Sequence, residues 1–249
     1  MRVSIIIPAY NEEYRIAKTL QAYNAFFLQK QQERILDYEV LVIVNGTTDN
    51  TVPLVKKLQQ TMPALLMEEI AQGGKGLAII YGFFNALTRD NDLIGFVDAD
   101  MATSPDAFYA LIMQCRNNEG VIASRYMKGS IVHPKRPFIK RWGSKIFFKS
   151  SVRTLFGISY YDTQCGAKIF KREVIQKIVT YLHEPHWSLD IEILYLCKRF
   201  GFIIQEVPTI WHDQAGSKLQ TFRAGMGMLK TLIKMRMHYW RRNNNIEAH

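Results

Sequence analysis

Short apolar runs alternate with segments of helical periodicity through the first 125 residues of this 249-residue chain. The runs are rich in Val, Ile and Leu without polar interruption, which is typical of strands buried on both faces of a parallel sheet. We expect strands at 3–8, 40–44, 65–67, 93–97 and 121–124, and helices at 12–28, 76–87 and 105–115 and from Thr51 onward. This rhythm predicts an α/β fold, a mainly parallel Rossmann-like sheet flanked by helices.

The strand expected at 93–97 ends in two carboxylates, Asp98 and Asp100, which a single residue separates. Alternate residues of an extended strand point the same way, so both side chains can converge at its carboxyl end. Open α/β sheets bind ligands at that end. Two hard oxygen donors there suit Mg²⁺ or Mn²⁺ that bridges to a diphosphate. Taken alone, the same residues also fit a strand that simply ends in an acidic turn.

The net charge of +10 is concentrated in two segments. Residues 120–161 contain nine basic and no acidic residues, and residues 214–246 contain seven basic and no acidic residues. The rest of the chain carries 16 basic against 22 acidic residues. This distribution predicts an anionic partner, for which a membrane surface, a phosphorylated lipid and nucleic acid are candidates. No nucleic-acid-binding module is recognisable, so we expect no nucleic-acid partner.

Each basic segment also carries an apolar stripe at helical spacing. In the first, the stripe comprises Phe138 or Ile139, Trp142 and Ile146. In the second it comprises Phe222, Met226, Leu229, Ile233, Met237 and Trp240. Such stripes can pack on the protein body, but cationic flanks with aromatic residues favour amphipathic helices that lie in a membrane interface.

The remaining composition concerns location. The three cysteines are scattered and form no CxxC motif, which favours reduced thiols in a cytosolic setting. No apolar stretch approaches the roughly 18 residues of a membrane-spanning helix. We therefore expect a cytoplasmic protein, peripheral on the cytoplasmic face of a membrane. Interfacial contact, a membrane-protein partner and a homo-oligomer remain open as means of attachment.

Several sequence blocks connect the chain to a known family. They are the opening strand and turn at 3–13, Gly73–Ala78, Asp98–Thr103, Asp162–Lys168, Trp187–Glu192 and Gly216–Leu219. In content and order they resemble the family 2 inverting glycosyltransferases of GT-A fold, and within that family the polyprenyl-phosphate sugar synthases. The resemblance implies metal-dependent inverting transfer of a hexose, glucose before mannose, from a nucleotide diphosphate sugar to a polyprenyl (dolichyl or undecaprenyl) phosphate.

The resemblance also implies a division of the chain. We expect a GT-A domain at 1–218, with a donor-binding half at about 1–125 and an acceptor- and membrane-facing half at about 126–218. A basic amphipathic C-terminal helix and tail should occupy 219–249.

Donor-binding residues follow from the matching motifs. Tyr10 offers a face for a nucleobase, Glu12 can accept hydrogen bonds from ribose hydroxyls, and Lys75 adds a cation to a glycine turn that a ligand can approach closely. Packing of the tyrosine and a purely structural turn are the alternatives. The full predicted set is Pro8, Ala9, Tyr10, Glu12, Asn45, Lys75, Asp98, Ala99 and Asp100, with Asp98 and Asp100 as metal ligands.

Two positions depart from the family pattern. Val44 and Asn45 stand where many members carry two aspartates. An amide matches the adjacent N–H and carbonyl of uracil, so Asn45 mildly favours UDP-glucose over GDP-mannose unless it only caps the turn. Ala102 stands where mannose synthases commonly carry a glutamine, so the metal would be held by Asp98, Asp100, the diphosphate and water.

On the acceptor side, a phosphate monoester is mostly dianionic at pH 7 and needs positioning more than a general base. The resemblance assigns this task to Arg125, Arg136, Arg141 and Lys218, with Asp162 and Gln164 shaping the pocket. Asp100, Arg125 and Lys218 form the predicted catalytic set. Asp190 and Glu192 lie behind the pocket and are expected to orient basic partners.

Two other functions are compatible with the same blocks. One is transfer to a saccharide hydroxyl, which needs a general base that the sequence does not offer clearly. The other is a degenerate domain that binds nucleotide or membrane without catalysis, for which Val44, Asn45 and Ala102 are the support.

Overall fold

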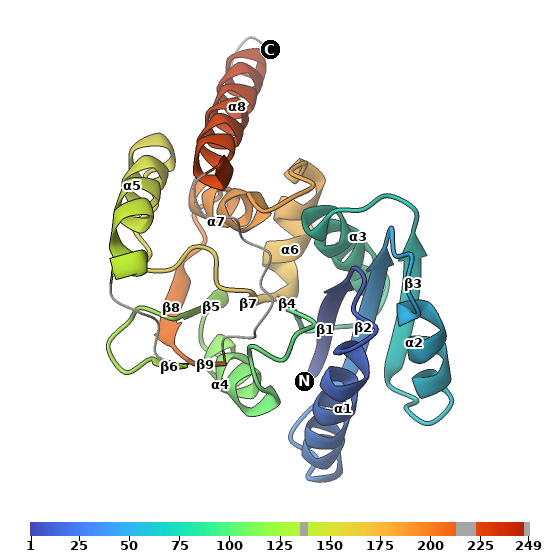
Figure 1. Ribbon diagram of the computed structural model, residues 1–249. Helices are drawn as coiled ribbons and strands as arrows, with labels where there is room; N and C mark the ends of the chain where they lie inside the picture. The colour runs from blue at the N-terminus through green and yellow to red at the C-terminus, as the bar shows by residue number, and fades with distance from the viewer. Residues whose placement is uncertain (135–138, 213–222, 247–249) are drawn as a thin grey trace.

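The structure, a computed structural model, describes residues 1–134, 139–212 and 223–246 (Figure 1), and the side chains of 139–147, 223–228 and 242–246 lie outside that description. A seven-stranded sheet in the order β3-β2-β1-β4-β7-β5-β8 forms its centre. The strands are β1 (Arg2–Ala9), β2 (Asp37–Asn45), β3 (Leu65–Ile70), β4 (Leu93–Val97), β5 (Gly120–Ser124), β7 (Ala167–Lys171) and β8 (Ile204–Pro208). All pairings are parallel except those of β7, which runs antiparallel to β4 and β5. The predicted mainly parallel sheet is confirmed.

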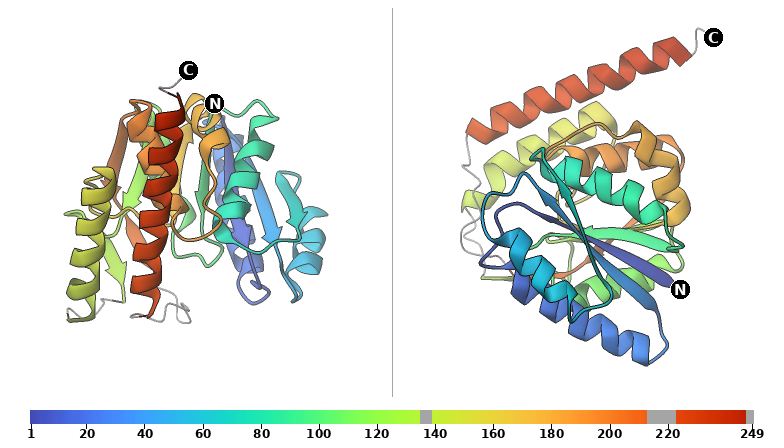
Figure 2. Two further views of the ribbon diagram at one scale, coloured as in Figure 1. Left: turned by 90° about the horizontal axis from the view of Figure 1, so that it is seen from above. Right: turned by 90° about the vertical axis from the view of Figure 1, so that its right-hand side faces the viewer.

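Helices cover both faces of the sheet (Figures 1 and 2). They are α1 (Ile16–Gln32), α2 (Thr51–Gln59), α3 (Lys75–Leu87), α4 (Pro105–Cys115), α5 (Ile139–Phe156), α6 (Arg172–Ile178), α7 (Leu189–Arg199) and α8 (Arg223–Ile246), with a 3₁₀ turn at Val179–Tyr181. A small two-stranded sheet pairs β6 (Ile131–His133) with β9 (Ile210–His212).

Strand alternation sorts the core into two layers. Ile5 and Ile7 face the layer of α1, α2 and α4, whereas Ile6 faces the layer of α3, α6 and α7. Because successive side chains of a strand point to opposite faces, a strand covered on both sides is apolar at every position. This explains why continuous Val and Ile runs predicted the strands correctly.

The two basic segments form α5 and α8, which pack side by side on the outer side of the α3, α6 and α7 layer (Figure 2). Leu232, Met235 and Tyr239 of α8 are buried in that layer. Within the described parts of the chain, no helix combines the length and apolar character needed to cross a bilayer.

The first helix starts later than its periodicity predicted. We expected it from Glu12, but α1 begins at Ile16 and the preceding residues form a turn. The N–H of Glu12 donates to Thr51 Oγ1 (2.9 Å) and the N–H of Glu13 donates to Asp49 Oδ2 (3.1 Å). These tertiary hydrogen bonds dock the turn on the residues after β2 and delay the helix.

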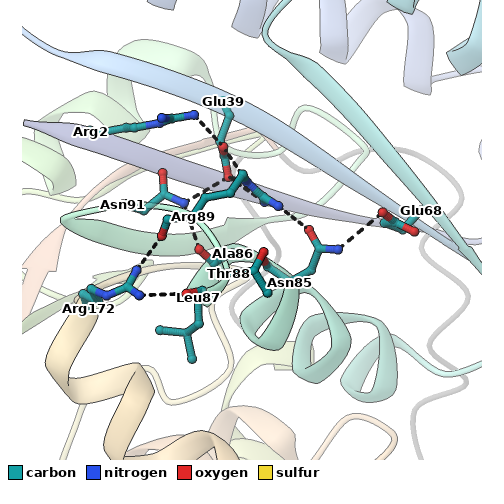
Figure 3. A network of polar contacts seen from close by, with 10 residues as sticks. All are labelled: Arg2, Glu39, Glu68, Asn85, Ala86, Leu87, Thr88, Arg89, Asn91 and Arg172. Carbon is teal, nitrogen blue, oxygen red and sulfur yellow. Dashed lines mark hydrogen bonds and ion pairs between the residues drawn. The ribbon is translucent and has the colours of Figure 1, made fainter.

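A buried network joins β2 to α3 and α6 at the opposite end of the sheet from the two aspartates (Figure 3). Glu39, 2% exposed, accepts hydrogen bonds from Arg89 Nε (2.8 Å) and Asn91 Nδ2 (3.1 Å). Arg172 extends the network by donating to the carbonyls of Arg89 (2.6 Å) and Leu87 (2.7 Å). Burial alone would raise the pKa of Glu39, but the hydrogen bonds and charge of Arg89 hold it below its usual value.

We predict that Glu39→Gln lowers the free energy of unfolding at pH 7 by about 1–3 kcal/mol, because it removes the buried charge that pairs with Arg89, whose side chain is 24% exposed. The pKa of Glu39 is lowered on folding, so its contribution is complete above the usual value of 4.5 and is lost as the pH falls through the lowered value. The difference between wild type and variant in urea unfolding should therefore shrink between pH 7 and pH 3.

Glu69→Gln is the matched control, because Glu69 pairs with Lys56 at the surface, with side chains 49% and 61% exposed. It should change the free energy of unfolding by less than about 1 kcal/mol. Equal effects of the two substitutions would contradict the importance of the buried network.

Candidate functional site

The predicted donor-side residues come together at one edge of the sheet. β1, β2 and β4 are parallel neighbours, so Ala9, Asn45 and Val97 end at the same edge. Asp98 and Asp100 follow β4 directly and are both partly exposed. The β9 strand reaches the same place, because the N–H of His212 donates to the Ala102 carbonyl (2.8 Å).

Three carboxylates lie within each other's electrostatic field here. Burial raises the pKa of Asp100, and the charge of Asp98 raises it further. The pKa of Glu12 is raised by burial and by both aspartates, against the opposing effect of Arg15. One oxygen of Asp100 accepts the N–H of Ala102 (3.0 Å), which fixes the turn after β4. The edge therefore holds an excess of negative charge.

Two basic side chains compensate part of that charge. Lys75 forms an ion pair with Asp98. Burial would lower the pKa of Lys75, but the attraction of Asp98, Asp190 and Asp100 raises it, so the ammonium stays charged. Arg15 binds Glu12 through two hydrogen bonds of 2.7 and 2.6 Å. A ribose hydroxyl that binds Glu12, as the sequence predicted, therefore has to share the carboxylate with Arg15.

Arg15 is a site residue that sequence analysis missed. Its position three residues after Glu12 is the spacing at which charged side chains meet on a helical turn. That spacing could have indicated the pair of Glu12 and Arg15 in the sequence.

The contacts of Asn45 fit the alternative that its amide caps the turn. Its side chain is 2% exposed. In the amide orientation that satisfies both groups, the nitrogen donates to the Ala9 carbonyl (2.9 Å) and the oxygen accepts the Gly74 N–H (2.9 Å). Both halves of the amide are thus used to join β1 to the glycine turn. The preference for uridine inferred from Asn45 loses its basis, since this amide serves the turn.

Pro8, Ala9 and Tyr10 lie at the end of β1, and Ala99 lies between the two aspartates. The two alanines are buried, and their carbonyls accept hydrogen bonds from the end of β2 and from Thr19 Oγ1 (2.7 Å), respectively. Tyr10 is 51% exposed, so the prediction that its ring stacks on a base stays open.

The antiparallel strand β7 carries the second half of the site. Ala167 pairs with Val97, which places Gly166 against Asp98. A Cβ added at Gly166 would lie 1.9 Å from Asp98 Oδ2, so no larger residue fits beside this carboxylate. One step along β7, the fully buried Lys168 forms an ion pair with Asp190 and donates to the Cys165 carbonyl (2.6 Å). The predicted orienting role of Asp190 is confirmed.

Two residues predicted for the acceptor side, Arg125 and Asp162, are partners of each other. Arg125 Nε and Nη2 donate to the Asp162 carboxylate at 2.7 and 2.9 Å, and the guanidinium lies 5.0 Å from the Trp211 ring centre. Burial opposes both charges, but their attraction lowers the pKa of Asp162 and raises that of Arg125. Arg125 and Asp162 therefore form an ion pair without net charge. Gln164 donates its backbone N–H to Asp162 (3.3 Å).

The other predicted acceptor residues cannot be placed. Arg136 and Lys218 lie outside the described residues, and Arg141 belongs to α5 but its side chain is not described.

A segment between the 3₁₀ turn and α7, residues 182–188, closes the site beside Lys75. The Leu77 N–H donates to the Pro185 carbonyl (3.1 Å), and the Trp187 ring centre lies 5.9 Å from Lys75 Nζ. A Cβ added at Gly76 would lie 2.4 Å from the Glu184 carbonyl oxygen, so the first turn of α3 requires glycine there. Gly76 and the neighbouring Gly74, whose added Cβ would lie 2.6 Å from the Pro185 oxygen, are the residues that could have indicated the contact in the sequence. We call residues 182–188 the bridging segment.

Comparison with known proteins agrees with this architecture. The sequence model described as glycosyl transferase family 2 matches residues 4–179. The chain is 32% identical to a dolichyl-phosphate beta-glucosyltransferase of Dictyostelium discoideum, over 95% of this chain and 74% of the relative. It is 31% identical to the enzyme of that name from Saccharomyces cerevisiae, over 95% of this chain and 75% of the relative.

A solved structure shares the fold. Glucosyl-3-phosphoglycerate synthase from Mycobacterium tuberculosis, crystallised with Mn²⁺, uridine diphosphate and glucosyl-3-phosphoglycerate, superposes with a TM-score of 0.66 at 17% identity. The match covers 94% of this chain and 79% of the other. The predicted GT-A fold is thereby confirmed.

We predict opposite effects for two neighbouring glycine substitutions. Gly76→Ala should lower the free energy of unfolding by about 1–3 kcal/mol, because the new methyl meets backbone atoms that cannot move aside. Gly73→Ala should leave it unchanged or raise it by up to about 1 kcal/mol, since nothing lies within 4 Å of the added Cβ. Urea unfolding of both variants measures the contrast. A neutral Gly76→Ala would contradict the close contact with the bridging segment.

Proposed function

This chain belongs to glycosyl transferase family 2, and from that premise we propose that it transfers glucose, with inversion, from UDP-glucose to dolichyl phosphate. The observation that carries the proposal is the convergence of Asp98, Asp100 and Lys75 at the carboxyl edge of the sheet. The acceptor and the sugar are inferred from the relatives named dolichyl-phosphate beta-glucosyltransferase, which the chain matches over 95% of its length. UDP rather than GDP is inferred from the named ligand of the similar synthase, since Asn45 no longer supports it.

The aspartate pair fits a divalent cation. Burial and the charge of Asp98 both raise the pKa of Asp100, and a cation held by the two carboxylates would offset their repulsion. Among the described residues, no group of three His, Cys, Asp or Glu side chains is arranged as a metal site, so the diphosphate and water would complete the ligands. A bound Mg²⁺ or Mn²⁺ would stabilise the negative charge that develops on the departing nucleotide diphosphate.

The protein's own residues position two anions. Lys75 stands at the start of α3, so its ammonium and the backbone N–H groups of the helix N-terminus are both placed to bind the diphosphate. An oxygen of the lipid phosphate attacks the anomeric carbon as the bond from that carbon to the diphosphate oxygen breaks. The attacking oxygen is already ionised, so no general base is required. Arg125 donates to Asp162 through Nε and Nη2, and we propose that its remaining N–H groups bind the acceptor phosphate, with Arg136, Arg141 and Lys218 as its companions.

The acceptor lipid requires the site to face a membrane, and α8 is suited to that contact. Ile233, Met237 and Trp240 of the predicted stripe are 41%, 45% and 59% exposed, so they point away from the protein body. Lys230, Lys234 and Arg241 are exposed around them. Cationic flanks around an apolar stripe are typical of helices in an anionic membrane interface. We place α8 and its neighbour α5 on the cytoplasmic face of a membrane.

The domain division becomes part of the same proposal. Residues up to about 125 bind the donor, residues 126–218 bind the acceptor, and residues 219–249 contact the membrane. The two halves share one sheet, because β7 and β8 complete the sheet that β1–β5 begin.

The reaction is tested with the purified full chain, Mn²⁺, UDP-glucose or GDP-mannose, and a short dolichyl phosphate, with the glycolipid detected by mass spectrometry. We expect a glucolipid from UDP-glucose. Asp100→Asn should reduce its formation roughly 100-fold or more while the melting temperature stays within a few degrees. Asp106→Asn, which alters an exposed carboxylate in the first turn of α4, is the matched control and should retain activity.

Other outcomes identify which part of the proposal fails. A mannolipid from GDP-mannose would overturn the choice of donor. Transfer only to a saccharide hydroxyl would overturn the lipid acceptor. Nucleotide binding without any transfer would favour the non-catalytic module.

Membrane contact is tested by flotation with vesicles containing about one quarter anionic lipid. We predict that the double variant Met237→Ser, Trp240→Ser loses most of the bound fraction, because it removes the apolar stripe and leaves the basic residues in place. Leu28→Ser, which changes an exposed apolar side chain (40% exposed) of α1 on the other face of the sheet, is the control and should bind as wild type does. If wild type bound vesicles with and without anionic lipid to the same extent, this would contradict the membrane role of α8.

A further inference from the structure

The bridging segment fixes the position of Lys75 from outside the donor site. Its backbone touches α3 at Gly74 and Gly76, where an added Cβ would lie 2.6 Å from the Pro185 oxygen and 2.4 Å from the Glu184 oxygen. The Pro185 oxygen also accepts the Leu77 N–H (3.1 Å). With so little free space, a displacement of the bridging segment moves the first turn of α3, and Lys75 with it.

Glu192 of α7 holds the bridging segment in place. The carboxylate is fully buried, and one oxygen accepts the backbone N–H groups of His183 (3.1 Å) and Glu184 (2.9 Å). The other oxygen forms an ion pair with His183 Nδ1. The sequence-based prediction that Glu192 orients a basic partner is confirmed. A buried carboxylate is costly without hydrogen bonds, so these contacts strongly restrict where the segment can lie.

The remaining contact to Glu192 comes from α8. Tyr239 is 0% exposed, and its hydroxyl lies 2.8 Å from Glu192 Oε1 and 2.9 Å from the Tyr181 carbonyl. The neighbouring buried residues of α8, Leu232 and Met235, pack in the apolar core, and the His238 ring stacks on that of His183 with 4.0 Å between ring centres. Packing of α8 therefore does not itself require a hydroxyl aimed at a buried carboxylate. This polar contact continues from α8 through Glu192 and the bridging segment to Lys75.

We propose that Glu192 and Tyr239 are positioning residues for the nucleotide diphosphate site, which they support by seating Lys75 beside Asp98. The inference rests on the proposed function, because it takes Lys75 as a donor-binding group. It adds two residues outside the carboxylate cluster, one of them on the helix that we place at the membrane.

The test is the affinity for UDP in the presence of Mn²⁺, measured by titration calorimetry on the full chain. Tyr239→Phe removes one hydroxyl and keeps the buried ring, and we expect it to weaken UDP binding roughly fivefold or more. Tyr195→Phe is the matched control, because the Tyr195 hydroxyl lies in the same interface, 3.4 Å from Arg236 Nη1, and its ring centre is 5.1 Å from that of Tyr239. Its affinity for UDP should stay within about twofold of wild type.

Glu192→Gln supplies a second variant and closes a double-mutant cycle. Glutamine keeps the side-chain length but removes the charge that the Tyr239 hydroxyl faces. It should weaken UDP binding by itself, and adding Tyr239→Phe should then change the affinity little, since both act through one contact.

These results distinguish a role in positioning Lys75 from a role that only stabilises the fold. Unchanged UDP affinity in Tyr239→Phe, even with a lower melting temperature, would overturn the inference and leave the proposed function intact. Equal weakening in Tyr195→Phe would also overturn it, because the effect would then come from general loosening of α7 and α8. A wild-type chain that binds neither UDP nor GDP with Mn²⁺ would overturn the proposed function and the inference together.

Discussion

The excess of negative charge at the carboxyl ends of β1 and β4 is the constraint on which the rest of the site depends. Burial and the neighbouring carboxylates raise the pKa of Asp100 and of Glu12 there, while Lys75 pairs with Asp98 and Arg15 pairs with Glu12. Charges this close repel strongly unless cations lie nearby. The glycine turn, the start of α3 and the bridging segment are arranged around the placement of one of those cations. The local fold is therefore closely tied to the charge balance of the site.

Much of the architecture was predictable because it arises from local pattern. β4 and α4 have the predicted bounds, since a five-residue apolar run and a Ser-Pro helix start are unambiguous signals. The start of α1 was wrong because Thr51 and Asp49, distant in sequence, hold the preceding turn. β7 was not predicted, since neither its direction nor its place between β4 and β5 is encoded in the spacing of its own residues.

The site divides in the same way. The motifs correctly brought Asp98, Asp100 and Lys75 to one edge, because parallel strands end together. Residue chemistry alone misjudged Asn45 and left Arg125 and Asp162 unpaired, since their roles depend on contacts across elements. Arg125 and Asp162 lie 37 residues apart in sequence and meet as a buried pair. Residue type indicates what a side chain can bind, whereas the fold decides whether that capacity is already used.

The antiparallel strand β7 limits how the chain can be divided. β5 lies within the first 125 residues, yet both of its sheet partners, β7 and β8, come from later in the chain. A fragment ending near residue 125 would leave β5 without a neighbouring strand and β4 with an open edge, which is a template for aggregation. The proposed donor-binding half is therefore not an independently folding unit. An exchange of acceptor halves between relatives would have to replace the centre of the sheet, rather than join two modules at a linker.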